Sequence, residues 1–280
     1  MYDIYYVGAQ NGERINFCQF PYMVTGGDLF SSDYDTVDED DHIQDFDRKI
    51  TNHTLEIEIR SKDRLMQAVD ELNGIAEKDL INVTPGRLYV GESYLKCWIT
   101  STDIGRWVND LDSVSNKLTV KSDYPYWITE KSYHFLKQSQ SGVVSPWLDY
   151  PYGQPYEYAK VRNLQYIQND GYTDSGFRMI IYGPCINPLI RIGGHVYELR
   201  TTLYEDEYAI IDSATRYAKD RKIIKVKADG TQEDIFNSRT TESEIWKKIQ
   251  PGRSIVTWSG AFGFDIILFN ERGTPRWTLS

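Results

Sequence analysis

The chain has few of the side chains from which metal centres and covalent cross-links are built. Among 280 residues it contains 3 cysteines and 4 histidines. The cysteines Cys18, Cys97 and Cys185 are odd in number and far apart, so we expect reduced thiols in a cytosolic product. The histidines are scattered, without the spacing of a metal site or a catalytic triad. They are His42, His53, His134 and His195. We therefore expect no metal and no cofactor.

Long apolar runs are also missing. No run reaches the ~18 residues from which a membrane-spanning helix is built. The N-terminal segment Met1–Tyr5 lacks the basic start and the apolar core of a signal peptide. We therefore expect no membrane insertion and no secretion.

Catalytic motifs are absent from the sequence. It has no G-x-S-x-G, no phosphate loop and no G-x-G-x-x-G. His195 follows Gly193-Gly194 and is interpreted as a turn residue. Paired carboxylates between expected strands leave a glycosidase open as an alternative. They are Glu205, Asp206, Glu207, Glu233 and Asp234. We expect that the protein is not an enzyme and has no catalytic residue.

Aromatic residues, in contrast, are abundant, with 21 Tyr, 7 Trp and 10 Phe. These residue types favour strands, and Tyr and Trp are enriched at protein interfaces. We interpret them as the core of a β protein with surface committed to partners. Stacking on sugar rings is the alternative for seven of them, which are Trp147, Tyr150, Tyr152, Tyr156, Tyr158, Trp246 and Trp258.

Negative charge dominates, since 41 acidic residues face 31 basic ones and the formal net charge is −10. Stable binding to a nucleic-acid backbone normally needs a basic surface. A simple DNA- or RNA-binding module is therefore not expected.

Alternating apolar residues predict strands in the first half of the chain. Residues 2–6 and 15–17 alternate around Asn11-Gly12, a pair that tolerates positive φ and is typical of a β-hairpin. A second hairpin is expected across Gly91-Glu92-Ser93. Further strands are expected at 54–60, 87–90, 94–99, 117–121 and 126–128.

One helix is predicted after the strand at 54–60. Ser61 is a plausible N-cap, and Leu65, Ala68, Val69 and Leu72 recur at helical spacing. Asn73-Gly74 is expected to end the helix by a left-handed cap, which leaves Ile75 and Ala76 beyond it.

The segment Ser31–Asp47 is densely acidic. Like charges at this density repel one another and resist packing, so we predict a mobile or partner-facing loop. A calcium loop is the alternative, although this segment lacks the central Gly and the terminal Glu of the EF-hand pattern. The acidic residues are Asp33, Asp35, Asp38, Glu39, Asp40, Asp41, Asp45 and Asp47.

The composition changes between Lys137 and Tyr158, where Gln, Ser, Pro and Tyr replace the periodic pattern. We predict a Tyr/Pro-rich linker at 137–158 between two domains, 1–136 and 159–280. Short strands with turn signals follow in the second domain and favour a β-sandwich or jelly roll. The expected fold class is mainly β, with one α-helix in an N-terminal β-sandwich-type domain.

The order of these segments resembles the distal tail proteins of long-tailed bacteriophages. In the first half the resemblance rests on Gly86–Trp98, directly after the helix. In the second half it rests on segments that are similar to the galectin-like C-terminal domain of that family. These segments are Asn187–Ile192, Ile210–Asp212, Lys222–Val226, Asp229-Gly230, Ile249–Ser254 and Trp258–Gly260.

The resemblance implies a structural virion protein that forms a homo-hexameric ring at the tail tip. The N-terminal domains would join the tail tube protein to the tail-associated hub protein, and the galectin-like domains would carry receptor-binding proteins. Assembly would take place in the cytoplasm of the bacterial host. Acidic segments near the lumen would keep passing phage DNA from adhering.

Two other classes of protein remain open at this point. A carbohydrate-binding module or adhesin could use the same sandwich on host cell-wall sugars, and a hydrolase could use the carboxylate pairs. A fold by itself does not decide between these functions.

Overall fold

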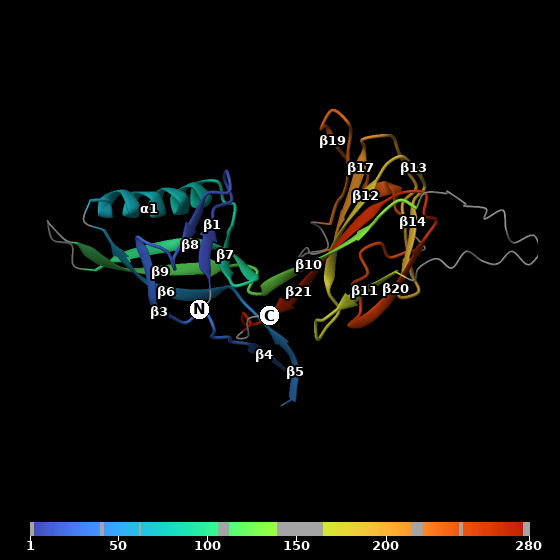
Figure 1. Cartoon of the computed structure of the whole chain (residues 1–280). Coiled ribbons are helices and arrows are strands. Elements are labelled where there is room, and N and C mark those ends of the chain that lie inside the picture. The colour runs from blue at the N-terminus through green and yellow to red at the C-terminus, as the bar shows by residue number, and fades with distance from the viewer. Residues whose placement is uncertain are drawn as a thin grey trace, which may run out of the picture. The chain divides into compact units, whose positions relative to one another are not determined.

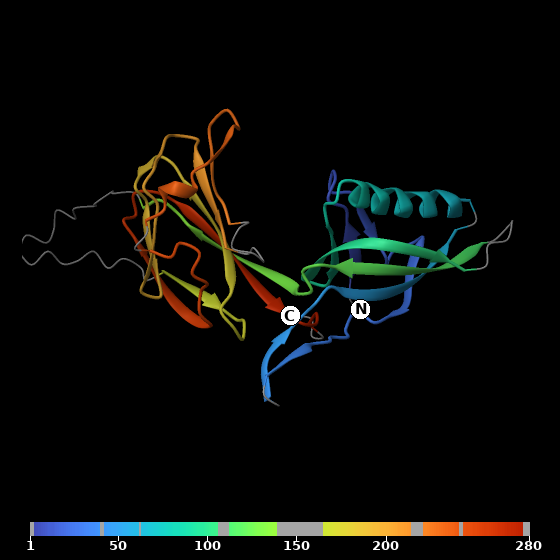
Figure 2. The same ribbon diagram turned by 180° about the vertical axis from the view of Figure 1, so that it is seen from behind.

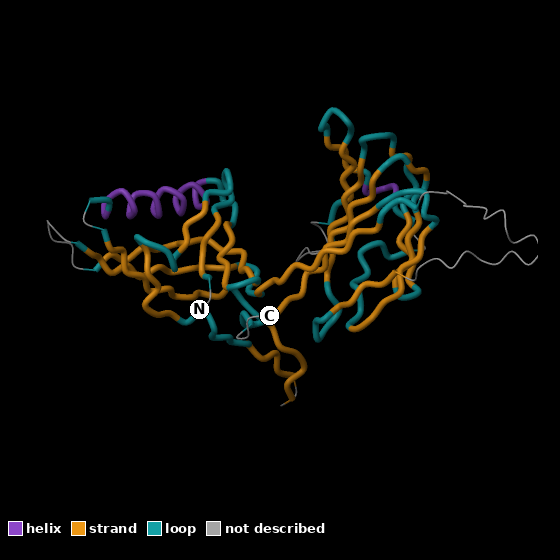
Figure 3. Tube along the Cα trace, in the orientation of Figure 1, coloured by secondary structure: helices purple, strands orange, loops and turns teal. Residues whose placement is uncertain are grey.

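The computed structural model describes residues 3–39, 42–61, 63–105, 112–138, 165–213, 221–240 and 243–276. These residues are mainly β and fall into two compact units, Met1–Thr129 with Glu271–Ser280, and Glu130–Asn270. Figure 1 labels the elements of both units, and Figure 3 shows that strands dominate each of them. The described part of the chain contains a single α-helix, as the sequence predicts.

The first sheet of unit 1 is antiparallel and has the order β2-β1-β7-β8. Asn11 and Gly12 have φ of 58° and 63°, so the predicted Asn-Gly hairpin is confirmed. Gly91, with φ of 61°, turns the second predicted hairpin. The strands are β1 (Ile4–Val7), β2 (Arg14–Asn16), β7 (Gly86–Val90) and β8 (Ser93–Ile104).

The second sheet of unit 1 has the order β3-β6-β9-β8, so the long strand β8 belongs to both sheets. β8 pairs with β7 as far as Cys97 and with β9 from Trp98 onward, and a register shift between Ile99 and Ser101 follows within the β9 pairing. Alternating burial along β6 puts Leu55, Ile57 and Ile59 in the core, as predicted. The new strands are β3 (Tyr22–Gly27), β6 (Thr51–Arg60) and β9 (Ser113–Ser122).

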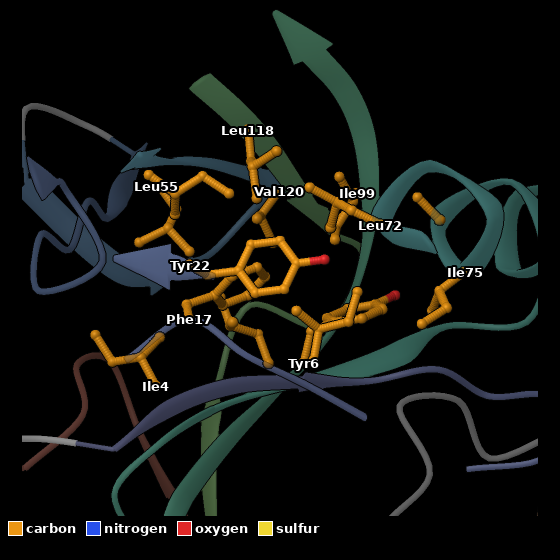
Figure 4. Close-up of a cluster of buried hydrophobic side chains, with 14 of the residues drawn as sticks. Ile4, Tyr6, Phe17, Tyr22, Leu55, Leu72, Ile75, Ile99, Leu118 and Val120 are labelled. Atoms are coloured by element: carbon orange, nitrogen blue, oxygen red, sulfur yellow. The ribbon is translucent and has the colours of Figure 1, made fainter. Parts of the chain in front are cut away.

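Helix α1 (Leu65–Ile81) packs on β6 and β8 and is longer than predicted. The expected stop at Asn73-Gly74 is wrong, because Ile75 and Ala76 continue the apolar stripe and are buried. Ser61 does not cap the helix itself; its hydroxyl accepts from Arg64 N–H (3.0 Å) in the preceding turn. Figure 4 shows Leu72 and Ile75 among the buried side chains of this core.

The predicted loop at Ser31–Asp47 is a β-hairpin instead, formed by β4 (Asp35–Glu39) and β5 (His42–Asp47). Val37, Ile43 and Phe46 supply the strand-forming residues that the charge density concealed. We call this element the acidic hairpin. In Figures 1 and 2 it extends away from the two sheets of unit 1.

Unit 2 is a β-sandwich. One sheet has the order β19-β18-β17-β12-β21, and the other has the order β11-β20-β14-β15. The first sheet consists of β12 (Gly176–Tyr182), β17 (Tyr208–Asp212), β18 (Ile223–Val226), β19 (Gln232–Asp234) and β21 (Phe264–Arg272). The second consists of β11 (Gln165–Asn169), β14 (Leu189–Ile192), β15 (His195–Glu198) and β20 (Gly252–Trp258).

Most strands of both sheets alternate buried and more exposed residues, with β19 exposed throughout, and the buried residues form one cluster. Phe177, Ile190 and Phe264 are fully buried in it. The small pair β13 (Cys185–Ile186) and β16 (Thr202–Leu203) and the 3₁₀ turn η2 (Phe236–Ser238) complete the unit. Short strands joined by turns follow one another along this half, and they form a sandwich, as the sequence predicts.

The chain runs between the two units twice, once in β10 (Trp127–Phe135) and once in β21. Residues 130–136 therefore belong to unit 2 and residues 271–276 to unit 1, a division that differs from the expected ranges at both places. A strand that continues across a boundary leaves no composition signal there. Residues 139–158 of the expected linker lie outside the described residues, so the linker stays a prediction.

Candidate assembly surfaces

The acidic hairpin exposes every side chain that the structure describes on β5. Three of its exposed residues are large and apolar: Val37 at 48%, Ile43 at 57% and Phe46 at 60% exposure. Apolar groups interleaved with carboxylates on a projecting element are typical of a surface that a partner covers.

The pairing of the two strands in the acidic hairpin is weakened by the residues that face each other across it. Asp35 lies opposite Asp47, and like charges facing across a ladder destabilise it. The register also shifts between Val37 and Asp38. An isolated two-stranded hairpin is marginally stable in water. Contacts outside the hairpin must therefore hold it in place.

Arg48 supplies such contacts at the base of the hairpin. Its side chain is only 2% exposed, and its guanidinium donates to the carbonyls of Pro125 and Asp33. The guanidinium also lies over the rings of Tyr34 (4.9 Å) and Tyr126 (5.4 Å). Cation–π attraction is strongest where water is excluded, as it is here.

The segment after β21 packs at the same base. The hydroxyl of Tyr124 donates to the carboxylate of Glu271, and Gly273 lies against Tyr34 and Arg48. A Cβ at Gly273 would come within 2.5 Å of the Tyr34 hydroxyl, so only glycine fits there without a shift. The C-terminal segment therefore helps to fix the base of the hairpin.

A groove of about 790 Å³ runs between α1 and the β1–β2 hairpin. Gly74 lines the groove without a side chain, and nothing lies within 4 Å of the position that a Cβ would occupy there. Lys78 Nζ binds both carboxylate oxygens of Glu13 at 2.8 Å across one end. The groove is a second surface of unit 1 on which a partner could lie.

The four histidines do not form a site. His42 lies on the acidic hairpin, and His53 is buried beside Asp28, with 3.6 Å between Nδ1 and Oδ1. Burial lowers the pKa of His53, and Asp28 opposes this shift. His134 contacts Asp265 at 2.8 Å, and His195 bonds a backbone carbonyl.

The candidate carboxylates serve local structure. Glu207 forms an ion pair with Lys225 at 2.7 Å, and this contact holds the pKa of Glu207 below its ordinary value. A general acid needs the opposite shift. Glu233 pairs with Lys227 at 3.1 Å, and Asp234 accepts from Phe236 N–H. Glu205 and Asp206 are exposed in the turn before β17.

The described residues offer no sign of an activated thiol at Cys97 or Cys185 and no cluster of metal ligands. Burial raises the pKa of Cys97, and it raises that of Cys185 to about 11, so neither is an activated nucleophile. Across the described ranges, no three His, Cys, Asp or Glu side chains converge as metal ligands. None of the described helices combines the length and the apolar character of a membrane span.

The aromatic candidates for sugar stacking divide into two sets. Trp246 and Trp258 are both only 7% exposed, and the indole of Trp258 donates to Phe262 O (2.9 Å). Neither ring is free to stack on a sugar. Trp147, Tyr150, Tyr152, Tyr156 and Tyr158 lie outside the described residues.

Sequence reasoning missed Arg48 and the apolar residues of the acidic hairpin. Val37, Ile43 and Phe46 recur among the acids, and this pattern could have suggested strands. The residues around Arg48 in the sequence do not reveal its role, because its partners Tyr126 and Pro125 lie far along the chain.

No model of a known protein family and no curated protein sequence matches the chain. Solved structures are similar over nearly the full length. The SPP1 Dit protein (gp 19.1), described as a paradigm of the hub adsorption apparatus of phages infecting Gram-positive bacteria, matches with a TM-score of 0.57 and 8% identity. That match covers 97% of this chain and 99% of the SPP1 chain.

Two structures of the phage P2 baseplate in its activated conformation contain similar chains. The calcium form gives a TM-score of 0.61 at 9% identity and covers 98% of this chain and 99% of that one. The strontium form gives a TM-score of 0.61 at 10% identity, and the match covers 97% of this chain and 99% of that one. From end to end, this chain therefore has the same fold as these phage Dit and baseplate chains.

Proposed function

We propose that the chain is a structural protein of a long-tailed phage, placed at the distal end of the tail. The observation that carries this proposal is the shared fold along 97–98% of the chain and 99% of each neighbour. A match of that extent includes both units in the same order. It therefore supports a common role more strongly than a shared sandwich does, because sandwiches serve many functions.

The acidic hairpin gives independent physical support. It exposes three large apolar side chains and pairs like charges, so a subunit alone gains little from forming it. Burial against another subunit would remove the apolar side chains from water. An assembling protein has a use for such an element, and a free monomer has none.

In the assembled state we propose a homo-hexameric ring made by unit 1. The ring joins the tail tube protein to the tail-associated hub protein, and unit 2 faces outward towards receptor-binding proteins. The protein is assembled in the host cytoplasm and remains in the virion. Closed cyclic symmetry makes such an assembly finite.

The role requires no catalysis. The candidate carboxylates are engaged in ion pairs or turns, and the thiols of Cys97 and Cys185 are not activated. Six copies at −10 each give the ring a charge of −60. This charge supports passage of phage DNA without adhesion.

The test is the mass and shape of the purified full-length chain, by light scattering and electron microscopy. Six chains of 32.5 kDa give a ring near 195 kDa. The double substitution Ile43→Ser with Phe46→Ser should leave a folded monomer. Ile255→Ser, at an exposed position of β20 in unit 2, is the matched control and should keep the ring.

A stable monomer at high concentration that does not join purified tail tubes would contradict the proposal. If that monomer bound cell-wall polysaccharide, the carbohydrate-binding alternative would replace it. Turnover of cell-wall material, abolished by one carboxylate substitution, would indicate a hydrolase.

A further inference from the structure

Unit 2 has a pocket of about 320 Å³ at the turn between β14 and β15. Gly193 and Gly194 form that turn, with φ of 56° and 85°. The volume lies at the small end of ligand sites, which span ~300–1,000 Å³. Such a space fits a small polar group and not a folded domain.

Two lysines give the pocket a positive charge. Lys247 and Lys248 both line it and are exposed, and no carboxylate is among the lining side chains. Among the residues of unit 2 that the structure describes, Lys131, Arg178, Lys225 and Lys227 form ion pairs. Within the described part of the chain, neither pocket lysine is paired.

Hydrogen bonds fix the segment that carries these lysines. The hydroxyl of Tyr197 donates to Lys247 O (2.7 Å), and His195 Nε2 lies 2.9 Å from Glu244 O. Because a carbonyl oxygen only accepts, Nε2 carries the proton in that bond. The backbone beneath the ammonium groups is therefore held in place by two side chains of β15, which lowers the ordering cost of binding.

A hydroxyl completes the lining. Ser254 is 9% exposed and lies beside the turn, since a Cβ on Gly193 would stand 3.1 Å from its Oγ. No described residue bonds this hydroxyl. Its lone pairs and proton are available to a ligand in the pocket.

From this geometry we infer that the pocket between the β14–β15 turn and Lys247-Lys248 binds a single phosphate group. Compact ammonium groups act as point charges and suit a tetrahedral oxyanion, whereas a planar carboxylate is matched better by the guanidinium fork. The hydroxyl of Ser254 adds one neutral hydrogen bond.

A nucleic acid is the less suitable occupant. Binding to its backbone requires cations that follow successive phosphates, and the chain has a net charge of −10. The pocket offers two cations at one place. It therefore recognises a single phosphate group, free or at one position of a polymer.

Glu244 provides an internal test of the electrostatics. It does not line the pocket, but its charge is close enough to contribute to the raised pKa of Tyr197, which is mainly due to burial. Its carboxylate opposes an anion in the pocket. Replacing Glu244 by Gln should therefore strengthen phosphate binding.

The experiment titrates the full-length chain into inorganic phosphate, glycerol phosphate and a poly(glycerol phosphate) polymer, and follows the phosphorus NMR line width. Saturable broadening is expected. Lys247→Gln with Lys248→Gln should weaken binding about tenfold or more. Glu244→Gln should tighten it about twofold. Lys222→Gln, an exposed lysine outside the pocket, is the control and should change nothing.

The three ligands separate the possible sources. Preference for the polymer assigns the site to a surface phosphodiester, and equal binding of inorganic phosphate assigns it to the free ion; either result supports a phosphate site. Unsaturable broadening, or equal broadening by the double lysine variant, overturns the inference. Tighter binding of a single-stranded oligonucleotide than of glycerol phosphate overturns it as well.

Discussion

Arg48 is a charged side chain that the fold keeps almost completely from water. Two backbone carbonyls and two tyrosine rings surround its guanidinium. Its Nη2 is buried without a hydrogen-bond partner in the described structure. The cation is thus stabilised partly by ring faces, and it links the base of the acidic hairpin to residues 124–126 and to the C-terminal segment.

Replacing Arg48 by Gln should lower the free energy of unfolding by about 2 kcal/mol, because the charge-assisted bonds and the ring contacts are lost together. Urea denaturation measures the change. Lys49→Gln is the control: this lysine is 73% exposed and pairs with Asp35 at 3.3 Å, so its loss should cost under about 0.5 kcal/mol. Equal effects of the two substitutions would refute the role given to Arg48.

His53 makes the stability of the protein depend on pH. Burial lowers its folded-state pKa below the ordinary 6.5, so the unfolded chain binds the proton more readily. The stabilisation is complete above about pH 6.5 and is lost progressively as the pH falls towards the lowered folded pKa. The slope from one such group is at most about 1.4 kcal/mol per pH unit.

The variant His53→Gln should therefore show a shallower loss of stability between about pH 7 and pH 5 than the parent chain. Urea unfolding at several pH values gives the slope. His42→Gln changes an exposed imidazole on β5 and should leave the slope of the parent chain. An unchanged slope in His53→Gln would assign the acid sensitivity to other groups.

At the scale of the element, helix α1 depends on what lies beneath it. Its final turns carry Asp79, which is 1% exposed and accepts from the Tyr6 hydroxyl (2.8 Å) and from Ala9 N–H (2.9 Å). These contacts, together with the burial of Ile75 in the core, stabilise the helix beyond Gly74, where local propensity alone predicts that it ends. Tertiary packing commonly overrides propensity in this way.

Two glycines of this region should respond oppositely to alanine. Gly74→Ala fills open space on the helix and should stabilise the protein by about 0.5–1 kcal/mol. Gly86→Ala places a Cβ 2.2 Å from the Tyr6 hydroxyl and should destabilise it by about 1–3 kcal/mol. Thermal unfolding of both variants tests the pair, and a stabilising Gly86→Ala would contradict the packing described here.

For the whole molecule, charge and assembly oppose each other. In the proposed ring, six chains with a formal charge of −10 each would repel one another, the acidic hairpins included. Salt shortens the range of their repulsion, to ~8 Å at physiological ionic strength. Added salt should therefore favour assembly of the ring, whereas it should weaken phosphate binding in unit 2, which depends on attraction.

Raising sodium chloride from about 20 mM to about 150 mM should increase the fraction of chain in the ring, as measured by mass photometry. Asp45→Asn with Asp47→Asn should reduce this dependence, because each removes a carboxylate from β5. A ring that dissociates as salt rises would show that attractive ion pairs hold it, contrary to the repulsion expected from the hairpin.

The sequence by itself determined the β class, most strands, both hairpin turns and the lack of catalytic motifs. These depend on alternation, on Asn-Gly and on residue types within a few positions of each other. The resemblance to distal tail proteins also came from the order of such local segments, and the end-to-end fold likeness agrees with it. The predicted helix was placed correctly at its apolar stripe.

Tertiary structure alone decided the remaining features, because they depend on residues far apart in the chain. The length of α1 follows from a core that includes Tyr6, and the acidic segment pairs as a hairpin held by Arg48. The C-terminal segment returns to unit 1. The lysine pocket requires β15 to lie beside residues 247–248. No local pattern encodes these approaches, since each is set by the free energy of the packed chain as a whole.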